Sequence, residues 1–399
     1  MEFALPNLKT RLIHWAVIGA CSVFLSPAVV YADVAQGLAA YQRNDYQEAF
    51  NQFQASAKQG DAEAQIYLSS MYRNGIWVQQ SDKEALLWLR KAAQQGHPFA
   101  QSDLGRVYLH GMGVPQDAAE AVKWFRLAAN QGSPVAQFDL AVAYSDGNGI
   151  LQDMSEAAAW YKKSAQQGYA PAQAQLGGAY AKGQGVAQDY AEAIKWARLA
   201  AEQGEPVGQF YLGYFYDQGL GVRQDYSTAH NWYLRSAEQG HPGAQNSLGD
   251  LYKEGRSVSQ DYQQAVRWYR MAAEQGNASA EFNLGALYEE GKGYSQSDQE
   301  AANWYLKSAS HGNPAALWRL GYFCREGKGV PKDLVIAYAL LDLASADNYA
   351  NMAEVSSRIN QDKAELAKQL TKAQMAEANS LASQWRAGAP FSFKSKTWK

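Results

Sequence analysis

The sequence predicts an all-α solenoid, in which consecutive helix pairs stack on one another. The first observation is a 36-residue period: a glycine recurs at this interval from Gly60 to Gly312 without an insertion or deletion. Counted from this glycine as offset 0, Leu always stands at +8, Gly at +15 and Ala at +25, and +28 is Trp in seven copies and Leu340 in the eighth. Such repeats are typical of stacked helix pairs, because one pair cannot bury its apolar face alone.

Offsets +2 to +13 predict a first helix in each copy, the A helix. Proline opens it in five copies, where the missing N–H costs nothing and the fixed φ is already helical. Gly at +15 stands where the helix would end in the left-handed conformation that favours glycine. The near-constant offsets +4, +8, +9, +11 and +12 share one half of a helical wheel, and the variable offsets +3, +6, +7, +10 and +14 share the other. One side of the A helix is therefore expected to pack and the other to vary.

A second helix, the B helix, is predicted to follow an N-cap at +21 with Glu or Gln three residues later, the capping-box pattern. Small residues at +9 and +25 let two helices approach closely, and the Trp at +28 is predicted to fill the remaining space as core packing. The eight full repeats occupy 60–347. A tighter helix pair precedes them at 33–59, in which Asp45 and Glu48 cap the second helix.

Residues 348–387 are predicted to form capping helices over 352–359, over 363–370 and from a capping box at Thr371 to near Trp385. A polar outer face on these helices would protect the last repeat from water. The remaining residues, 388–399, predict a mobile tail.

The repeat pattern is specific enough to suggest a family. Residues 136–168 follow A-x-x-x-L-G-x-x-Y-x-x-G-x-G-V-x-Q-D-x-x-x-A-x-x-W-x-x-x-A-A-x-x-G with small changes. This pattern resembles the Sel1-like repeat, a relative of the tetratricopeptide repeat, and the resemblance covers about 60–347. It implies a right-handed α/α superhelical solenoid whose A helices line the concave side, and a role as an adaptor in envelope assembly, in signalling through membrane partners or in host contact.

Residues 1–32 predict a secretory signal peptide that is removed after Ala32. Lys9 and Arg11 precede the apolar run LIHWAVIGACSVFL, and small residues stand at the −3 and −1 positions of the cleavage site. The mature chain is therefore expected in the periplasm or outside the cell.

Two alternatives for this segment stay open. Residues 12–31 are long enough to remain as a membrane anchor, which would be the chain's one link to a membrane. The stretch from Ile18 to Cys21 faintly resembles a bacterial lipoprotein box.

Composition and motifs argue against an enzyme, a cofactor or a metal site. The net charge is −3, so the chain lacks the basic field that a nucleic-acid partner requires. His97 and His241 lie four repeats apart, and no His-Glu-x-x-His, Cys-x-x-Cys, P-loop or Ser-x-x-Lys motif is present. Cys324, the sole thiol once Cys21 has left with the signal, stands at a packed offset and is expected to be buried and inert.

The variable side of the A helices supplies the candidate partner-binding residues. They stand at +6, +7 and +10, where exposed aromatic residues and Arg are typical anchors of protein interfaces. The +7 and +10 tyrosines are expected to be exposed, whereas for the +6 residues packing between adjacent A helices is an equal alternative. The candidates are Tyr67, Asp103, Arg106, Asp139, Phe210, Tyr211, Tyr214, Asp250, Trp318, Arg319 and Tyr322.

These features predict an exported, monomeric and non-catalytic scaffold that binds a protein or peptide in its concave groove. An alternative is a cell-envelope enzyme that acts on peptidoglycan or a β-lactam, which rests on the labels of disulfide-rich relatives and on the compartment. A further alternative is glycan binding on the aromatic residues.

Overall fold

The computed structural model describes residues 28–346 and 353–385, and these residues form helices and no strand. The predicted all-α class is confirmed. The signal-peptide prediction lies outside the described residues up to residue 27, and so does the predicted tail. Within the described ranges, no helix has the length and apolarity needed to cross a bilayer.

Each full repeat contributes one A helix and one B helix. The A helices run from +2 to +14, one residue further than predicted: α4 (Ala62–Asn74), α6 (Pro98–His110), α8 (Pro134–Asp146), α10 (Ala170–Lys182), α12 (Pro206–Gln218), α14 (Pro242–Glu254), α16 (Ala278–Glu290) and α18 (Pro314–Glu326). The B helices start at +22: α5 (Asp82–Gln94), α7 (Ala118–Asn130), α9 (Met154–Gln166), α11 (Tyr190–Glu202), α13 (Tyr226–Glu238), α15 (Tyr262–Ala273), α17 (Asp298–Ser310) and α19 (Leu334–Ala346).

Two further helices stand at each end of the repeats. The entry pair is α2 (Ala28–Gln42) and α3 (Tyr46–Lys58), so α2 begins upstream of the predicted cleavage position. The exit helices are α20 (Ala353–Ala367) and α21 (Lys372–Gln384). The prediction of separate helices over 352–359 and 363–370 was wrong, because α20 runs unbroken from Ala353 to Ala367 and no Gly or Pro interrupts it. The capping box of Thr371 and Gln374 is confirmed with both of its hydrogen bonds.

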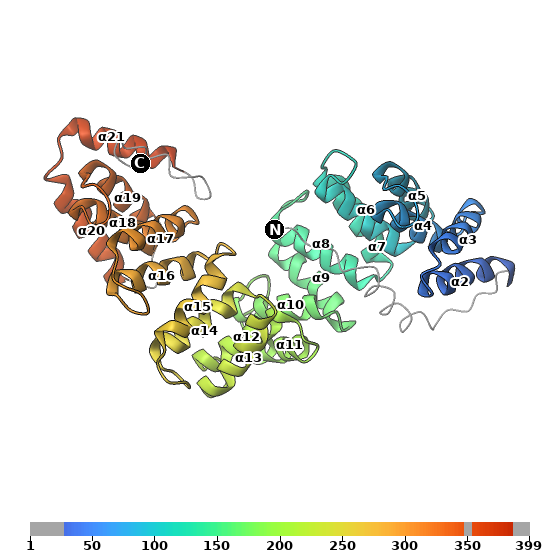
Figure 1. The fold of residues 1–399 in the computed structure, drawn as a ribbon, viewed down its shortest axis with the longest axis horizontal. Coiled ribbons are helices and arrows are strands. Elements are labelled where there is room, and N and C mark those ends of the chain that lie inside the picture. Colours follow the sequence, from blue (N-terminus) through green and yellow to red (C-terminus); the bar gives the residue numbers. More distant parts are fainter. Residues whose placement is uncertain (1–27, 347–352, 386–399) are drawn as a thin grey trace. The chain divides into compact units, whose positions relative to one another are not determined.

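The helices group into two compact units, which divide between Gln152 and Asp153. Among the described residues, the first unit holds α2 to α8 and the second holds α9 to α21 (Figure 1). Within each unit, helices that follow one another along the chain pack side by side, which is the arrangement of an α/α solenoid.

The predicted helix ends are formed by the predicted residues. Gly111 ends α6 with φ 67°, and its N–H bonds to the Val107 carbonyl. The side chain of Asp117 accepts the Glu120 N–H at 2.9 Å and so caps α7. A carbonyl acceptor at the C-terminal end of α6 and an N–H donor at the N-terminal end of α7, which would otherwise lack partners, are thereby satisfied.

Close packing of the A and B helices depends on a small residue at +9 beneath an aromatic ring at +29. A Cβ added to Gly249 would lie 2.4 Å from the Tyr269 ring, and one added to Gly285 would lie 2.7 Å from Tyr305. Tyr269 and Tyr305 are fully buried. The predicted close approach is confirmed, but the ring that fills the space stands at +29 and not at +28.

The Trp at +28 packs where two successive repeats meet, a contact that we call a joint. Trp88, Trp196 and Trp268 are buried, as predicted for core packing. Trp268 of α15 belongs to the cluster that α14 of its own repeat forms with α13 of the preceding repeat. A Lys or Arg side chain from the same helix often covers the Trp ring, as in Lys91, whose Nζ lies 4.1 Å from the centroid of the Trp88 ring. The Trp therefore joins successive repeats and shields the edge of the core.

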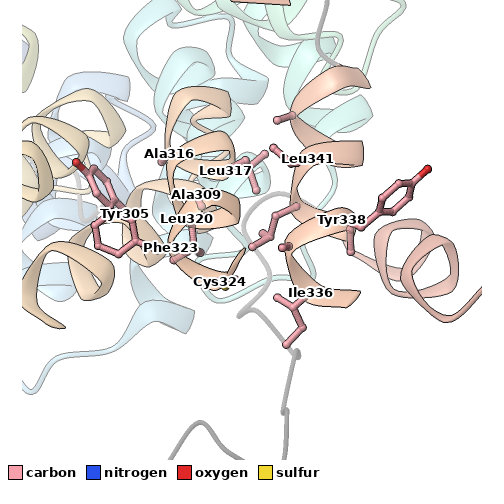
Figure 2. Packing of buried hydrophobic residues seen from close by; sticks show 14 of the residues in the cluster. Tyr305, Ala309, Ala316, Leu317, Leu320, Phe323, Cys324, Ile336, Tyr338 and Leu341 are labelled. Atoms are coloured by element: carbon pink, nitrogen blue, oxygen red, sulfur yellow. The ribbon is translucent and has the colours of Figure 1, made fainter. Parts of the chain in front are cut away.

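The final repeat contains the free thiol of Cys324 in a cluster of buried apolar side chains. Figure 2 shows Cys324 of α18 among buried side chains that include Leu320, Ile336 and Leu341. Cys324 is 0% exposed. Burial, with Asp333 nearby, raises the pKa of the Cys324 thiol to about 12. The expectation of a buried cysteine is confirmed, and the raised pKa disfavours the thiolate, which is the reactive form.

A row of buried glutamines at +5, which the sequence analysis missed, also joins successive repeats. Gln245 donates from Nε2 to the Ala237 carbonyl at 3.2 Å, and its Oε1 accepts from Gln275 at 2.8 Å. The same two bonds form around Gln65, Gln101, Gln173 and Gln209. At one joint Glu281 and His311 replace the pair, 2.7 Å apart. Each bond satisfies a polar group that burial would otherwise penalise.

Candidate partner-binding face

The eleven candidate residues all lie on A helices. We call the residues at offsets +6, +7, +10 and +13 of the A helices the A-helix face. One contact recurs along it: the residue at +7 of one repeat meets the residue at +10 or +13 of the preceding repeat. This contact follows from the stacking of A helices within each unit, because side chains three and four residues apart share one side of a helix.

In the first unit, ion pairs link neighbouring A helices along the A-helix face. Arg73 of α4 bonds to Asp103 of α6 at 2.8 Å. Arg106 of α6 bonds to Asp139 of α8 through Nε at 2.9 Å and Nη2 at 3.0 Å. A bidentate pair of this kind is stronger and more directional than a single contact. Three of the candidates are thus partners of one another or of Arg73.

Asp139 lies in a part of the face that is largely shielded from solvent. Its side chain is 13% exposed and that of Arg106 is 24% exposed. Burial raises the pKa of the Asp139 carboxyl, and the nearby charge and hydrogen bonds of Arg106 oppose that rise. The pair therefore holds a charge away from water at the joint between α6 and α8.

Tyr67 is half-buried rather than exposed. Its ring stacks on Phe53 of the entry pair, with centroids 4.9 Å apart. Its hydroxyl donates to Glu63 at 3.3 Å. Burial and the neighbouring Glu63 raise the pKa of the Tyr67 hydroxyl. Tyr67 therefore contributes mainly to packing at the N-terminal end of the face.

The second unit carries an aromatic patch, which we define as Phe210, Tyr211, Tyr214 and His241. The Phe210 ring stacks on His241 of the next repeat with centroids 4.7 Å apart and lies 6.5 Å from the Tyr214 ring. Tyr214 is 38% exposed, as expected for a +10 tyrosine, whereas Tyr211 is half-buried. Phe210 packs against the next repeat, which is the alternative left open for the +6 residues.

A glycine in the preceding repeat makes room for this patch. A Cβ at Gly178 would lie 2.6 Å from the Tyr211 hydroxyl oxygen. Tyr211 therefore lies across the backbone of α10 at a point where a larger residue would displace it.

His241 caps α14 through its ring. Its Nδ1 accepts the Ala244 N–H at 3.1 Å, a bond that the ring can accept only in its neutral form. Burial lowers the pKa of His241. At the same offset Asn277 and Asn313 cap their helices through the amide oxygen.

We expect the variant His241→Asn to keep the cap and to lose part of the acid sensitivity. Because the folded-state pKa of His241 is lowered, the unfolded chain binds the proton more tightly, and the wild type loses stability as pH falls below the unfolded value of about 6.5. The measurement is urea unfolding at pH 7.5 and 5.0. Equal loss of stability on acidification in both proteins would contradict this role.

The last repeat gathers three further candidates. Arg319 forms an ion pair with Glu289 of α16, and its guanidinium carbon lies 5.0 Å from the centroid of the Tyr322 ring. Trp318 donates from Nε1 to Asp362 of α20 at 3.0 Å. Tyr322 is half-buried, with the Arg319 guanidinium over its ring. This end of the face is therefore held by contacts to α16 and to the exit helix.

Asp250 is bound by its own neighbours. Its Oδ1 accepts from the Tyr269 hydroxyl at 2.7 Å, and Lys253 lies 3.3 Å away. Asn246 and Asn283 also donate to its carboxylate. Asp250 thus serves the joint between α14 and α16.

The sequence analysis missed offset +13. Arg73, Asp217 and Glu289 stand there, and two of them pair with a +7 residue of opposite charge thirty positions later. That opposite charge, Arg73 with Asp103 and Glu289 with Arg319, was a readable signal in the sequence. Offset +13 itself lies between the constant and the variable halves of the helical wheel.

Among the described residues, the A-helix face carries aromatic rings and paired ions rather than a cluster of metal-ligating side chains. Within residues 28–346 and 353–385, no group of three or more His, Cys, Asp or Glu side chains is arranged to hold a metal ion. Its functional groups are aromatic rings, paired ions and one open patch around Tyr214. Such groups contact a protein surface or a peptide, where a few buried aromatic residues supply most of the affinity.

Helix pairs of constant length, glycine-ended A helices and joints at +5, +7 and +28 define an α-helical repeat protein of the solenoid class. The Sel1 repeat matches eight consecutive segments: 62–97, 98–133, 134–169, 170–205, 206–241, 242–277, 278–313 and 314–349. The chain belongs to the Sel1 repeat family. This solenoid fold typically serves as a scaffold for protein–protein interaction, and proteins of the family are generally non-catalytic.

Solved structures of similar proteins agree with this assignment. A protective antigen present in uropathogenic Escherichia coli strains, which displays an SLR fold, is 32% identical with a TM-score of 0.54. That comparison covers 89% of this chain and 83% of the antigen. A Sel1 repeat protein from Oxalobacter formigenes is 34% identical with a TM-score of 0.54, over 79% of this chain and 90% of that one. No curated protein matches the chain.

Proposed function

We propose that this protein is an exported, non-catalytic scaffold that binds a protein or peptide partner on its A-helix face. The observation that carries the proposal is the aromatic patch around Tyr214. There, rings from two successive repeats lie together, and Tyr214 keeps 38% of its surface open to solvent. An exposed aromatic side chain on a rigid helix is a favourable anchor, since little conformational entropy is lost when it is covered.

The charges along the face support a site in the second unit. In the first unit, the acidic and basic residues of the face pair with one another. A partner that contacted them would have to replace bonds that are already made. Around Tyr214 the surface is aromatic and partly open, so contact there requires no such exchange.

The test is capture of a partner from the envelope fraction by wild type and by Tyr214→Ala. Leu199 supplies a matched control: it lies in the same unit, is 39% exposed and stands on the B helix α11. We expect Tyr214→Ala to reduce capture at least tenfold, a typical effect of removing an interface anchor, and Leu199→Ala to leave it unchanged. Equal capture by the three proteins would count against the A-helix face.

Export is the second part of the proposal. It rests on the charged residues, the apolar run and the cleavage pattern of residues 1–32, and a relative described as a protective antigen supports it. Expression of the full chain, followed by cell fractionation and mass measurement of the mature protein, tests it. We expect a periplasmic or secreted chain that begins at Asp33. An unprocessed chain in the membrane fraction would favour the anchor instead.

A further inference from the structure

The joint between α12 and α14 differs from the other joints of the second unit in one respect. It contains a carboxylate oxygen that no donor in the described chain reaches. Asp217 stands at +13 of α12, and its Oδ1 is buried with no hydrogen-bond partner. Its Oδ2 accepts from Gln218 at 2.9 Å and, more weakly, from the Tyr233 hydroxyl at 3.4 Å. A carboxylate oxygen removed from water without a donor costs free energy, so an arrangement of this kind requires an explanation.

The joint between α16 and α18 shows what such a site takes when it is filled. Glu289 stands at the same +13 offset and Tyr305 at the same +29 offset as Tyr233. The Tyr305 hydroxyl bonds to Glu289 at 2.8 Å. The Arg319 guanidinium, from +7 of the next repeat, then binds Glu289 through Nε at 2.8 Å and also through Nη2. One carboxylate, one tyrosine hydroxyl and one guanidinium complete this joint.

The joint between α12 and α14 has the carboxylate and the tyrosine hydroxyl but lacks the guanidinium. Ser247 occupies the +7 position that Arg319 fills in the last repeat. Its side chain is hydrogen-bonded to the Tyr233 hydroxyl, and it is too short and carries no charge to neutralise Asp217. At the joint between α14 and α16 the +13 residue is Lys253, which lies beside the +10 carboxylate Asp250, and Asn283 also reaches Asp250. Of the two carboxylates at +13, Glu289 is paired with an arginine and Asp217 has no cationic partner among the described residues.

We propose that the joint between α12 and α14 binds a basic side chain of the partner, with a guanidinium as the best fit, and that Asp217 is its counter-ion. A guanidinium is planar and matches a carboxylate with two parallel hydrogen bonds, as Arg319 and Glu289 show within this chain. Asp217 as a whole residue is half-buried, although Oδ1 itself is covered. In this proposal the guanidinium draws the carboxylate outward, which the broad terminal torsion of the side chain allows.

Tyr214 adds the aromatic neighbour that such a cation prefers. It stands three residues before Asp217 on α12, so both side chains lie on one side of the helix. Its exposed ring offers a face to the guanidinium or to the methylene groups that carry it. This inference rests on the proposed function, because it names the chemistry of the partner that the aromatic patch would receive.

The test uses the full protein and two fluorescein-labelled peptides, Gly-Ala-Arg-Ala-Gly and its twin with citrulline in place of arginine. Citrulline keeps the shape and removes the charge. Binding is measured by fluorescence polarisation at low ionic strength. We expect the wild type to bind the arginine peptide at least tenfold more tightly than the citrulline peptide. Asp217→Asn should lose this preference, while Glu120→Gln, which alters a half-buried carboxylate paired with Lys123 in the first unit, should retain it.

Ser247→Arg provides the internal counterpart of Arg319. Its own guanidinium should reach Asp217, so we expect a raised melting temperature and loss of the arginine preference. If Asp217→Asn still prefers the arginine peptide, or if the wild type binds both peptides equally, the site is refuted, and a buried water at Asp217 becomes the explanation. The proposed function is judged separately: loss of capture in Tyr214→Ala supports the A-helix face whatever the peptides show.

Discussion

Gly249→Ala is expected to destabilise the second unit by about 3 kcal/mol, the upper part of the range for overpacking a filled core. The added methyl group would lie 2.4 Å from Cε1 and 2.5 Å from Cδ1 of Tyr269. The Tyr269 ring is fully buried and held by its bond to Asp250, so it cannot move aside without breaking other contacts. Urea unfolding followed by circular dichroism measures the loss.

The chain itself supplies the control for this prediction. In the first full repeat, Ser69 stands at the offset of Gly249 and Leu89 at the offset of Tyr269, and both are buried. The double variant Gly249→Ser, Tyr269→Leu reproduces this combination. We expect it to be more stable than the sum of its single variants by at least about 1 kcal/mol, because the collision disappears. Strict additivity would show that the ring does not limit this position.

Arg106→Met should cost about 3 kcal/mol at neutral pH, since it removes the partner of a nearly buried carboxylate. Asp139 would then carry an uncompensated charge between α6 and α8. The double variant Arg106→Met, Asp139→Leu should recover most of the loss, because well-packed apolar residues replace a buried ion pair at little cost. Lys123, whose side chain is 71% exposed beside Glu120, is the control, and Lys123→Met should have an effect below about 0.5 kcal/mol.

The same variant should respond to pH in a defined direction. Burial already raises the pKa of Asp139, and Arg106 opposes the rise. Without Arg106 the pKa rises further, so the folded state binds a proton that the unfolded chain, with a carboxyl pKa near 3.9, does not bind. Stability of Arg106→Met should therefore increase as pH falls from 7.5 toward 5. A decrease as large as that of the wild type would indicate that Asp139 gains water on losing its partner.

Local features of the fold were predictable because short stretches of sequence encode them. The glycine at +15 and the N-cap at +21 satisfy backbone groups within a few residues, so Gly111 and Asp117 could be assigned without coordinates. The exit helix was the exception. Residues 352–370 carry weak signals that suggested two helices, and the absence of a breaking residue let α20 run through.

The candidate face was only partly predictable. Its location on the A helices followed from the contrast between constant and variable offsets. Which residues on it face a partner did not follow, because exposure depends on the next repeat. Asp103 and Arg106 look like surface charges in the sequence, yet each is bound by a residue thirty or more positions away. Tyr67 looks like an anchor and instead stacks on Phe53.

The sequence by itself determined the period, the ends of the repeat helices and the side of each A helix that packs, since all of these depend on neighbours close in the chain. Only the tertiary structure decided how the variable side is used. Stacking brings +13 of one repeat against +7 of the next, and the side chains present there either neutralise each other or do not. Among the described residues, Arg73 and Glu289 have partners of opposite charge and Asp217 has none, because pairing depends on which residues stacking places together.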